Sequence, residues 1–334
     1  MTSKFRVGIT ADVLKSDGVP IFGQEVLGLF DDPAIEWEFM DGSSAKITHA
    51  QAARYDAICA MITRVTPESL SGADRRLKLI ARFGVGYDTI DVPACTKAGV
   101  ILTIAPDGVR RPVATSALTF VLMLAQKVLI KDKLTRAGRW NEKLDHIGTG
   151  LTGRTLGSIG VGNIGAELFH LAKPLEMNFI AHDPAVDPQS AAGIGVRLVD
   201  MDTLFRESDF LTVNCPLSDE TRGLVNARLI GLMKRSAYLI NTARGPIVDE
   251  QALYDALANG RIAGAGLDVF AEEPTPASNP ILKLDNVIVT PHGICFTDEC
   301  MRRLAESAFR GTLDVAAGRR PPYIVNPEAL ANRT

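Results

Sequence analysis

Residues 155–183 read TLGSIGVGNIGAELFHLAKPLEMNFIAHD, and their pattern is the strongest indication of the fold. A short apolar run leads into a glycine-rich turn, Gly160-Val161-Gly162-Asn163-Ile164-Gly165, and apolar residues then recur at helical spacing. A second apolar run ends at Asp183. The order strand, glycine turn, helix, strand, acid is typical of a βαβ unit that binds a dinucleotide.

Each glycine of the turn has its own predicted task. Gly160 permits the tight turn, Gly162 lets the backbone approach a pyrophosphate, and Gly165 lets the helix lie close to the strand. Asn163 and Ile164 open that helix, whose free N–H groups and positive dipole end favour phosphate. Asp183 follows Gly165 by 18 residues, where a carboxylate accepts hydrogen bonds from the adenosine ribose. A glycine turn that serves packing alone is the alternative, but the strand, the helix and the acid all agree with dinucleotide binding.

Length and composition predict a globular chain of two domains. The 334 residues are 46% hydrophobic and 22% charged, which suits domains that each bury a core. The net charge of −3 is spread along the chain without long runs, which favours neither nucleic acid nor an anionic membrane as partner. The most apolar long segment, 113–130, is interrupted by polar residues, so we interpret it as a buried helix and not a membrane span.

Cysteine usage and the N-terminus predict a cytoplasmic location. The five cysteines are odd in number and form no CxxC pair, which suits reduced thiols and gives no metal site. The first ten residues, MTSKFRVGIT, lack the apolar core of a signal peptide.

The first hundred residues predict a small α/β domain. Apolar runs that alternate with helical stretches indicate parallel strands, at 5–10, 35–40, 57–62, 79–83 and 100–104, with helical stretches at 22–29 and 67–70. A second glycine-rich turn, at 83–88, has the wrong spacing for a dinucleotide. Its Val85-Gly86 pair could direct N–H groups at a small anion, but without further context a plain strand-to-helix turn is the better explanation. We place the first crossing between domains at 104–108 and expect a long helix from Pro112 to about Arg136.

The remaining apolar runs predict the strands of a larger, doubly wound parallel sheet. With the two runs of the glycine-turn unit they give seven strands, the later five at 196–199, 210–213, 238–241, 265–269 and 287–290. Helices are expected at 226–233 and 250–258. A last helix, 297–317, could return the chain to the first domain. The predicted domains are 1–104 with 298–334, and 105–297.

Three ionisable residues follow strands of the second domain, at the sheet edge where ligands bind. They are Arg244 after LINTA, Glu273 after LDVF and His292 after VIVTP. A histidine bonded to a carboxylate is held as one tautomer and can donate a proton reversibly. An arginine offers a planar fork to the carboxylate and carbonyl of a 2-oxo acid. With a dinucleotide, these groups indicate hydride transfer to a carbonyl.

The segments GVGNIG, CPLSDETRGLVN, LINTARGPIVDEQAL, GAGLDVFAEEP and VIVTPHG resemble, in order and spacing, those of the D-isomer-specific 2-hydroxyacid dehydrogenase family. The resemblance runs from about Leu77 onward. It implies a Rossmann NAD-binding domain inserted in a smaller flavodoxin-like substrate domain, with a 2-oxo acid as substrate and a homodimer as the assembly.

The resemblance also implies individual roles. Arg244 would bind the substrate carboxylate and carbonyl, Glu273 would pair with His292 as the acid–base group, and Val85 and Gly86 would hold the carboxylate by backbone N–H groups. The remaining cofactor-binding residues implied within the quoted motifs are Pro216, Thr221, Thr242 and Asp268.

The chain departs from the family pattern beside the substrate pocket, at Asn214, at 293–295 and at the hinge, where Arg110 and Arg111 follow. Two cations at the positive end of a helix are unfavourable. A nearby acid such as Asp107, or solvation, could offset that cost; alternatively, Arg110 or its neighbour contacts a substrate with a second anionic group.

Several alternatives in function remain open. One is oxidation of phosphoglycerate, and another is an NAD(H)-sensing binding protein of the corepressor type. Phosphite and formate oxidation use related scaffolds, and no feature of the sequence favours them.

Overall fold

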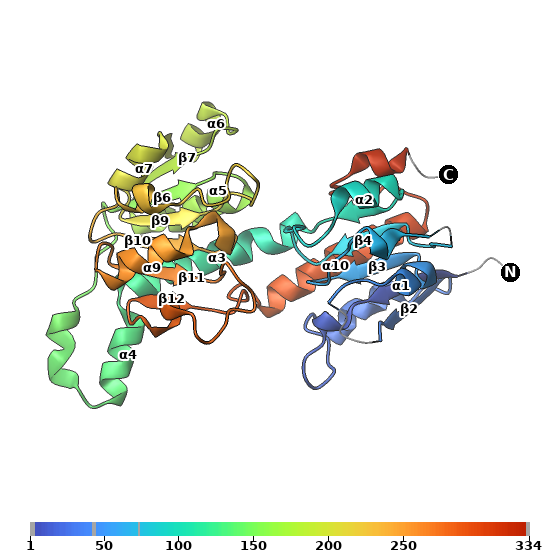
Figure 1. The fold of residues 1–334 in the computed structure, drawn as a ribbon, viewed down its shortest axis with the longest axis horizontal. Coiled ribbons are helices and arrows are strands. Elements are labelled where there is room, and N and C mark those ends of the chain that lie inside the picture. Colours follow the sequence, from blue (N-terminus) through green and yellow to red (C-terminus); the bar gives the residue numbers. More distant parts are fainter. Residues whose placement is uncertain (1–3, 42–44, 73, 332–334) are drawn as a thin grey trace. The chain divides into compact units, whose positions relative to one another are not determined.

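The computed structural model describes residues 4–41, 45–72 and 74–331. The chain forms two compact units (Figure 1). Unit 1 comprises Met1–Pro112 and Phe296–Thr334, and unit 2 comprises Val113–Cys295. One unit is therefore inserted in the other, and the first crossing lies after Pro112, inside a helix, instead of at residues 104–108.

Unit 1 is built on a five-stranded parallel sheet with the order β2-β1-β3-β4-β5. This is the flavodoxin-like order. The strands are β1 (Phe5–Ile9), β2 (Ile35–Phe39), β3 (Ala57–Ala60), β4 (Leu79–Arg82) and β5 (Ile101–Thr103). The α-helices of this unit are α1 (His49–Arg54), α2 (Val92–Lys97), α10 (Asp298–Ala316) and the start of α3 (Pro106–Ala125). The predicted small α/β domain is confirmed.

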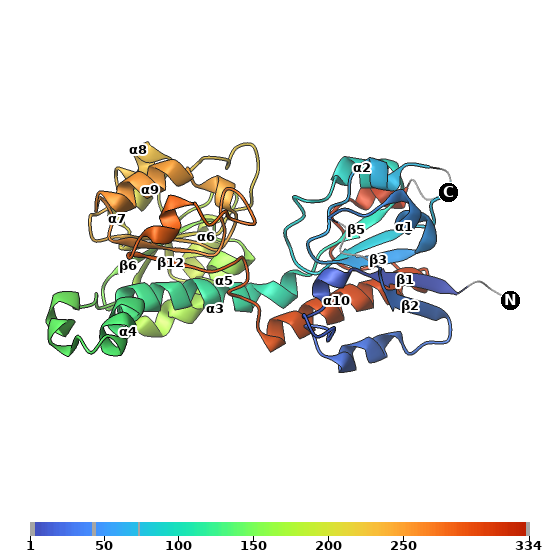
Figure 2. The same ribbon diagram turned by 60° about the horizontal axis from the view of Figure 1, so that its bottom comes forward.

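Helix α10 covers one face of this sheet by packing on β3 and β4, and Figure 2 shows α2 over the opposite face. The contact is aromatic at its centre. Phe309 of α10 lies 5.5 Å from Phe22, 4.4 Å from Phe30 and 5.8 Å from Phe83, measured between ring centroids. Such pairs add to the free energy of burying the rings themselves. They anchor the chain directly after β4, where Phe83 begins the second glycine-rich turn.

Unit 2 is built on a seven-stranded parallel sheet with the order β12-β11-β10-β9-β6-β7-β8. Because β6 has β7 on one side and β9 on the other, the strand order reverses there, as in a Rossmann sheet. The strands are β6 (Thr155–Ile159), β7 (Asn178–His182), β8 (Val196–Leu198), β9 (Phe210–Val213), β10 (Tyr238–Asn241), β11 (Gly264–Leu267) and β12 (Val287–Val289). The doubly wound sheet predicted from the sequence is confirmed.

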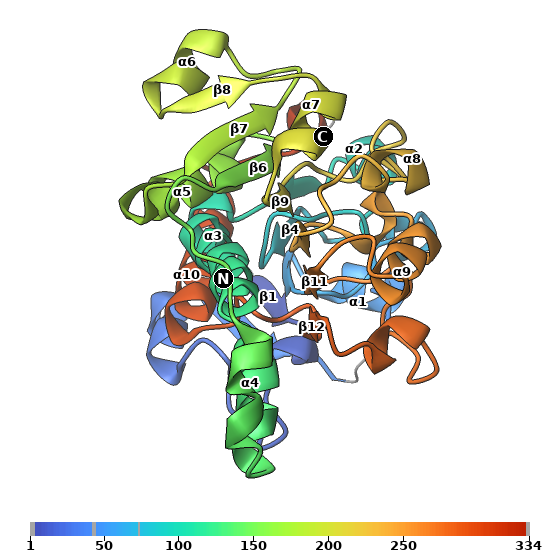
Figure 3. The same cartoon turned by 90° about the vertical axis from the view of Figure 1, so that its left-hand side faces the viewer.

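Helices lie on both faces of the unit 2 sheet (Figure 3). Helices α3 and α5 (Asn163–Ala172) cover one face, where Phe120 and Phe169 are fully buried. Helices α7 (Met201–Glu207), α8 (Ala227–Ile230) and α9 (Glu250–Ala258) cover the other face over a second apolar cluster. Helix α6 (Pro188–Gly193) packs beside β8. Each face thus has its own core, and the strand ends are left to carry polar groups.

Shorter helical segments differ most from expectation. The predicted helices at 22–29 and 67–70 are 3₁₀ segments, Gln24–Phe30 and Glu68–Leu70, and the one at 226–233 is α-helical only in α8. Further 3₁₀ turns are Ala11–Val13, Trp140–His146, Lys173–Leu175, Gly245–Ile247, Pro280–Lys283 and Pro327–Leu330.

The prediction of one helix from Pro112 to Arg136 is wrong. Helix α3 begins at Pro106, ends at Ala125 and contains Pro112, and α4 (Val128–Arg136) follows at an angle of 55°. Pro106 suits the first turn, where no N–H partner is required. The break has a local cause, since Lys127 adopts a left-handed conformation with φ of 52°. Arg110 and Arg111 accordingly lie inside α3, and not ahead of its positive end.

Among the residues that the structure describes, no single helix has the length and apolar character to cross a membrane. The bent pair of α3 and α4 meets that test of length and composition only when both helices are taken together.

The left-handed Lys127 gives a matched test of the helix break. Lys127→Gly should raise the free energy of unfolding by about 0.5–1 kcal/mol, because glycine adopts a positive φ without strain. The same substitution at Lys131, inside α4, should lower it by about 0.5–1 kcal/mol. Urea unfolding of both variants measures the difference, and a loss of stability in Lys127→Gly would contradict the break at this residue.

Candidate functional site

The glycine turn follows β6 at the point where the strand order of unit 2 reverses. Gly160 has a φ of 97°, and a Cβ there would lie 3.0 Å from the carbonyl oxygen of Asn214. A Cβ on Gly165 would overlap the carbonyl oxygen of Gly160. Packing within the protein therefore requires both of these glycines.

Gly162 differs from its two neighbours. A Cβ added there would meet no protein atom within 4 Å, and its φ of −67° is open to any residue. The fold itself does not require glycine at this position. The open space lies at the N-terminus of α5, which offers N–H groups and a positive dipole end. The turn therefore fits the pyrophosphate of a dinucleotide.

Asp183 ends β7 and fastens the glycine turn to the neighbouring strand. Its Oδ2 accepts a hydrogen bond from Val161 N at 2.7 Å, and its Oδ1 accepts from Ala185 N at 2.9 Å and Val186 N at 3.2 Å. Partial burial opposes ionisation, but these N–H groups hold the pKa of Asp183 below its usual value. The residue is therefore a fixed negative charge beside the turn.

Asn214, noted above as a departure from the family pattern, directly follows the adjacent strand β9 and supports the turn. Its Nδ2 donates to Ser158 Oγ at 2.9 Å and to Thr212 Oγ1 at 3.0 Å. Ser158 Oγ in turn donates to the carbonyl oxygen of Gly160 at 2.6 Å. Sequence reasoning missed Ser158, which is fully buried in an apolar run and gives no signal of its own.

The loop after β9 contains Pro216 and Thr221. The Thr221 hydroxyl donates to the carbonyl oxygen of Pro216 at 2.7 Å and accepts from Ser218 N at 2.7 Å. The hydroxyl thus shapes its own loop. Thr242, directly after β10, is half-buried.

The structure brings His292 and Glu273 together. His292 Nδ1 lies 2.6 Å from Glu273 Oε2, and Glu273 Oε1 accepts from Phe270 N at 2.9 Å. Burial opposes ionisation of Glu273, but His292, the Phe270 N–H and the positive charge of Arg244 together lower its pKa below the usual value. Glu273 is therefore an ionised partner for the imidazole at neutral pH.

Asp268 holds the histidine in place. Its buried Oδ1 accepts from Thr290 Oγ1 at 2.5 Å, from Gly293 N at 2.9 Å and from Ile294 N at 3.1 Å. Its carbonyl oxygen accepts from His292 N at 2.8 Å. His292 adopts a left-handed conformation with φ of 51°, which these bonds on either side of it stabilise.

Arg244 lies on a turn that is fixed by groups the sequence did not single out. Asn241 Nδ2 donates to the carbonyl oxygen of Arg244 at 2.9 Å, and Asn241 Oδ1 accepts from Ala243 N at 3.0 Å. The next residue, Gly245, is packed so closely on Phe270 that a Cβ would overlap the Phe270 carbonyl group. The Arg244 turn therefore rests directly on the loop that carries Glu273.

Glu250, the first residue of α9, secures the same loop from the other side. Its Oε2 accepts from Ala271 N at 2.9 Å, and its Oε1 accepts from Asn279 Nδ2 at 2.8 Å. A charged residue at a helix start is usually explained by the helix dipole, so nothing in the sequence indicates this second contact of Glu250.

Two sequence-predicted groups lie in unit 1. Val85 and Gly86 follow β4 in a loop where both are partly exposed, and Arg110 is exposed in the second turn of α3. Asp107, suggested as the local acid for the two arginines, accepts a hydrogen bond from the Tyr323 hydroxyl.

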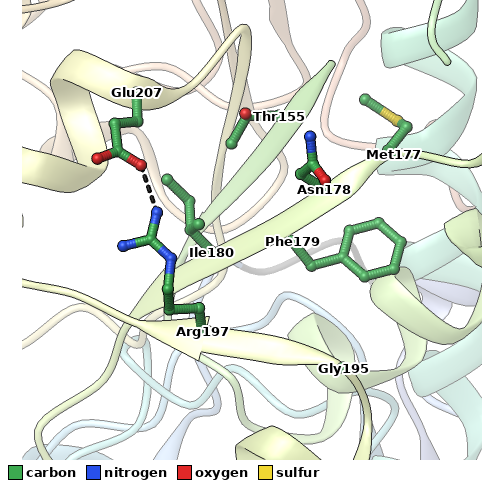
Figure 4. A pocket seen from close by; sticks show the side chains of 8 residues that line it. All are labelled: Thr155, Met177, Asn178, Phe179, Ile180, Gly195, Arg197 and Glu207. Carbon is green, nitrogen blue, oxygen red and sulfur yellow. Dashed lines mark hydrogen bonds and ion pairs between the residues drawn. The ribbon is translucent and has the colours of Figure 1, made fainter. Parts of the chain in front are cut away.

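A hollow of about 430 Å³ lies at the opposite edge of the unit 2 sheet (Figure 4). Thr155, Asn178 and Gly195 line it near the amino ends of β6, β7 and β8, and an Arg197–Glu207 ion pair crosses it. It is remote from the glycine turn, which follows the carboxyl end of β6. Within the described ranges, no group of three or more His, Cys, Asp or Glu side chains could hold a metal ion.

Comparisons with known proteins agree with this geometry. Residues 118–293 match the NAD-binding domain of D-isomer-specific 2-hydroxyacid dehydrogenases. The chain is 35% identical over 300 residues to a glyoxylate reductase of Korarchaeum cryptofilum, covering 89% of this chain and 90% of that protein. It is 38% identical over 296 residues to a D-3-phosphoglycerate dehydrogenase of Archaeoglobus fulgidus, covering 88% of this chain but 56% of that longer protein.

Among solved structures, D-lactate dehydrogenase from Aquifex aeolicus, complexed with NAD and lactic acid, superposes with a TM-score of 0.81 at 28% identity, covering 98% of both chains. The fold and the glycine turn define an NAD-binding oxidoreductase. The chain belongs to the D-isomer-specific 2-hydroxyacid dehydrogenase family, and NAD is its cofactor.

The glycines of the turn give a prediction that separates folding from cofactor binding. Gly162→Ala should leave the unfolding temperature unchanged but weaken NADH binding about tenfold or more, because its methyl group enters the space left for the pyrophosphate. Gly165→Ala should instead destabilise unit 2 by about 1–3 kcal/mol, because its methyl group overlaps the backbone. Thermal unfolding and NADH fluorescence titration measure both, and unchanged NADH affinity in Gly162→Ala would contradict the assignment.

Proposed function

We propose that this chain reduces 2-oxo acids to D-2-hydroxy acids with NADH, and catalyses the reverse reaction with NAD. The observation that carries the proposal is the 2.6 Å contact of His292 with Glu273. Glu273 follows β11 and His292 follows β12 of the NAD-binding unit. The family membership supports the same reaction.

NADH supplies the hydride in this reaction, and the protein supplies the proton and the binding groups. Because Glu273 engages Nδ1 of His292, Nε2 of the ring remains for the substrate oxygen. The carboxylate fixes the tautomer and stabilises the imidazolium, so His292 donates its proton as the carbonyl becomes a hydroxyl. Arg244 binds the carboxylate and carbonyl of the 2-oxo acid by its planar fork.

The remaining proposed contacts divide between cofactor and substrate. The glycine turn, Asp183 and the loops that contain Pro216, Thr221 and Thr242 bind NAD. Asp268 does so as well: within the described part of the chain its Oδ2 makes no hydrogen bond, which leaves this oxygen as an acceptor for the cofactor. The N–H groups of Val85 and Gly86 hold the substrate carboxylate.

A homodimer is the proposed assembly. Large apolar side chains are exposed on α4 and in the segment after it, among them Trp140 at 63%, Leu144 at 71% and Ile147 at 70%. A concentration of such residues is typical of a protein interface. We further propose a cytoplasmic location, since Cys59 and Cys95 are buried thiols, which persist in a reducing compartment.

The proposed function is tested by the loss of NADH absorbance with a panel of 2-oxo acids, including glyoxylate, hydroxypyruvate, pyruvate and 3-phosphohydroxypyruvate. We expect saturable oxidation of NADH with at least one member. The phosphorylated compound also tests the second candidate, a phosphoglycerate-type dehydrogenase, which the 38% identity to such an enzyme favours. No oxidation with any member would contradict the proposal.

The acid–base pair gives the next prediction. His292→Ala should lower kcat by about 10²–10⁴-fold while NADH affinity barely changes, because the proton donor is lost and the dinucleotide turn is intact. His170→Ala, an exposed histidine of α5, is the matched control. Near-normal turnover in His292→Ala would remove the mechanism.

Glu273→Gln extends this prediction to pH. The variant should keep part of the activity, and the pH above which reduction declines should move downward. The direction of this shift follows from charge. Reduction needs the imidazolium, and an amide stabilises that cation less than the ionised carboxylate does. Profiles of kcat against pH for the two proteins measure the displacement.

Cofactor preference follows from the fixed charge of Asp183. We expect kcat/KM to be about tenfold or more higher with NADH than with NADPH, because the ionised carboxylate repels a 2′-phosphate. Asp183→Ser should narrow that ratio. Equal or better use of NADPH by the unaltered protein would refute the assignment.

We also propose that Arg110 favours substrates with a second anionic group. The residue is exposed, and it lies on the helix that begins beyond the carboxyl end of β5. Arg110→Ala should lower kcat/KM for 3-phosphohydroxypyruvate relative to glyoxylate by about tenfold, the effect of one charge-assisted contact. Arg111→Ala is its control, and an unchanged ratio in Arg110→Ala would refute the proposal.

A further inference from the structure

Arg82, the last residue of β4, is bonded to the loop that follows it. Its Nε donates to the carbonyl oxygen of Gly86 at 2.9 Å, and its Nη1 donates to that of Phe83 at 3.1 Å. One planar guanidinium thus connects the two sides of the loop. The acid–base pair and the dinucleotide turn belong to unit 2, whereas Arg82 belongs to unit 1.

Most carbonyl oxygens of the loop accept hydrogen bonds from other groups of the protein. Besides the two that Arg82 binds, the Gly84 oxygen accepts from Ala105 N at 2.9 Å, and the Tyr87 oxygen accepts from Ile90 N at 2.9 Å. A loop whose acceptors are bound internally exposes less negative partial charge to an anion.

Two donors of the same loop, in contrast, are available. In the parts of the chain that the structure describes, the N–H groups of Val85 and Gly86 make no hydrogen bond. Gly84, with φ of 141°, supplies the left-handed conformation that this arrangement needs. The loop therefore combines bound acceptors with available donors, which is the composition of a backbone anion site.

Arginine is suited to this task in a way that lysine is not. Two N–H groups of a rigid fork can bind two carbonyl oxygens at once, whereas an ammonium group is a point charge on a flexible stem. The Arg82 Nη1 lies 3.7 Å from the position that a Cβ on Gly84 would take, so the cation lies directly against the loop. Its charge also attracts an anion to the neighbouring N–H groups.

We propose that Arg82 is a positioning residue that fixes the Phe83–Gly86 loop so that the N–H groups of Val85 and Gly86 bind the carboxylate of the 2-oxo acid. This inference rests on the proposed function for the identity of the anion. Arg82 itself acts through the loop and does not contact the substrate.

Steady-state kinetics of Arg82→Ala and Arg82→Lys test the proposal with the 2-oxo acid that serves best in the panel. Arg82→Ala should raise KM for the 2-oxo acid about 10–100-fold, the effect of losing one or two hydrogen bonds from a charged donor. The kcat should stay within about threefold, since bound substrate restores the order of the loop and the change is one of binding. The affinity for NADH, whose glycine turn is in unit 2, should not change.

Arg82→Lys tests the planar geometry of the guanidinium group separately from its positive charge. Lysine keeps the positive charge but can bind only one of the two carbonyl oxygens. Because the loop loses that second bond, Arg82→Lys should raise KM nearly as much as Arg82→Ala does. Guanidinium chloride at low millimolar concentration should partly restore KM in Arg82→Ala. The control is Arg303→Ala, an exposed arginine of unit 1 that pairs with Glu299 on α10, and it should change neither parameter.

Binding of oxalate, a non-reacting dicarboxylate, to the NADH complex gives a readout that does not depend on turnover. Calorimetry should show weaker oxalate binding in both Arg82 variants by the same factor as KM. If the unaltered protein reduces no 2-oxo acid, the proposed function fails, and the oxalate titration still decides whether Arg82 supports an anion site.

The inference is overturned if KM and oxalate affinity are unchanged in Arg82→Ala. It is also overturned if kcat and NADH affinity fall while KM rises and oxalate affinity falls, since that pattern indicates a general loss of structure. Should Arg82→Ala not fold, as judged by circular dichroism, Arg82→Lys provides the same comparison.

Discussion

The buried carboxylate of Asp268 is the constraint on which the proposed chemistry depends. It is 4% exposed, and a charge so placed is costly unless hydrogen bonds compensate it. Thr290 Oγ1, Gly293 N and Ile294 N supply those bonds. The same bonds hold the loop around His292, whose left-handed backbone would otherwise cost about 1–3 kcal/mol. The imidazole can therefore meet Glu273 in one fixed orientation.

Arg244 and Glu273 are coupled by packing of the backbone. The chain after Arg244 passes so close to Phe270 that only glycine fits at position 245. Asn241 fixes the turn from inside the sheet, and Glu250 fixes the Glu273 loop from α9. Groups that follow three neighbouring strands, β10, β11 and β12, thus form one rigid arrangement. Such preorganisation is what a proton donor and an arginine fork require in order to act on one small substrate.

Each of the two sheets presents a proposed anion site at its carboxyl edge, but the two sites are supported differently. In unit 2 the reversal of strand order at β6 exposes the glycine turn at the carboxyl edge. In unit 1 the loop after β4 lies at the carboxyl edge of its own sheet, where Arg82 binds its carbonyl groups. Backbone N–H groups are the proposed anion ligands in both units, with helix α5 supporting one set and an arginine the other.

Much of this architecture could be predicted because it depends on local pattern. Strands β9 and β10 and helix α9 have the predicted bounds, since apolar runs and helical spacing mark buried elements directly. The helix break at Lys127 could not be predicted, because a left-handed lysine has no signal in composition. The prediction that α3 starts at Pro112 failed because both Pro106 and Pro112 suit the first turn of a helix, and the helix begins at the earlier one.

Some residues of the site could be predicted from the sequence and others could not. Glu273 and His292 were paired through the family resemblance, and the structure brings them to 2.6 Å. Ser158, Asn241, Glu250 and Arg82 were missed, because each acts by a hydrogen bond to backbone that depends on the course of a loop; for Glu250 the partner is also distant in the sequence. A polar residue inside or beside a strand looks like any other in the sequence. Its partner is set by register and loop course, which the pattern of residue types does not contain.

The proposed reaction is measured most directly by following the hydride itself. NADH with deuterium in both C4 positions of the nicotinamide should be supplied with the best 2-oxo acid of the panel, and the product analysed by mass spectrometry and chiral chromatography. We expect one deuterium at C2 of a 2-hydroxy acid of D configuration. A product without deuterium, or of L configuration, would contradict it.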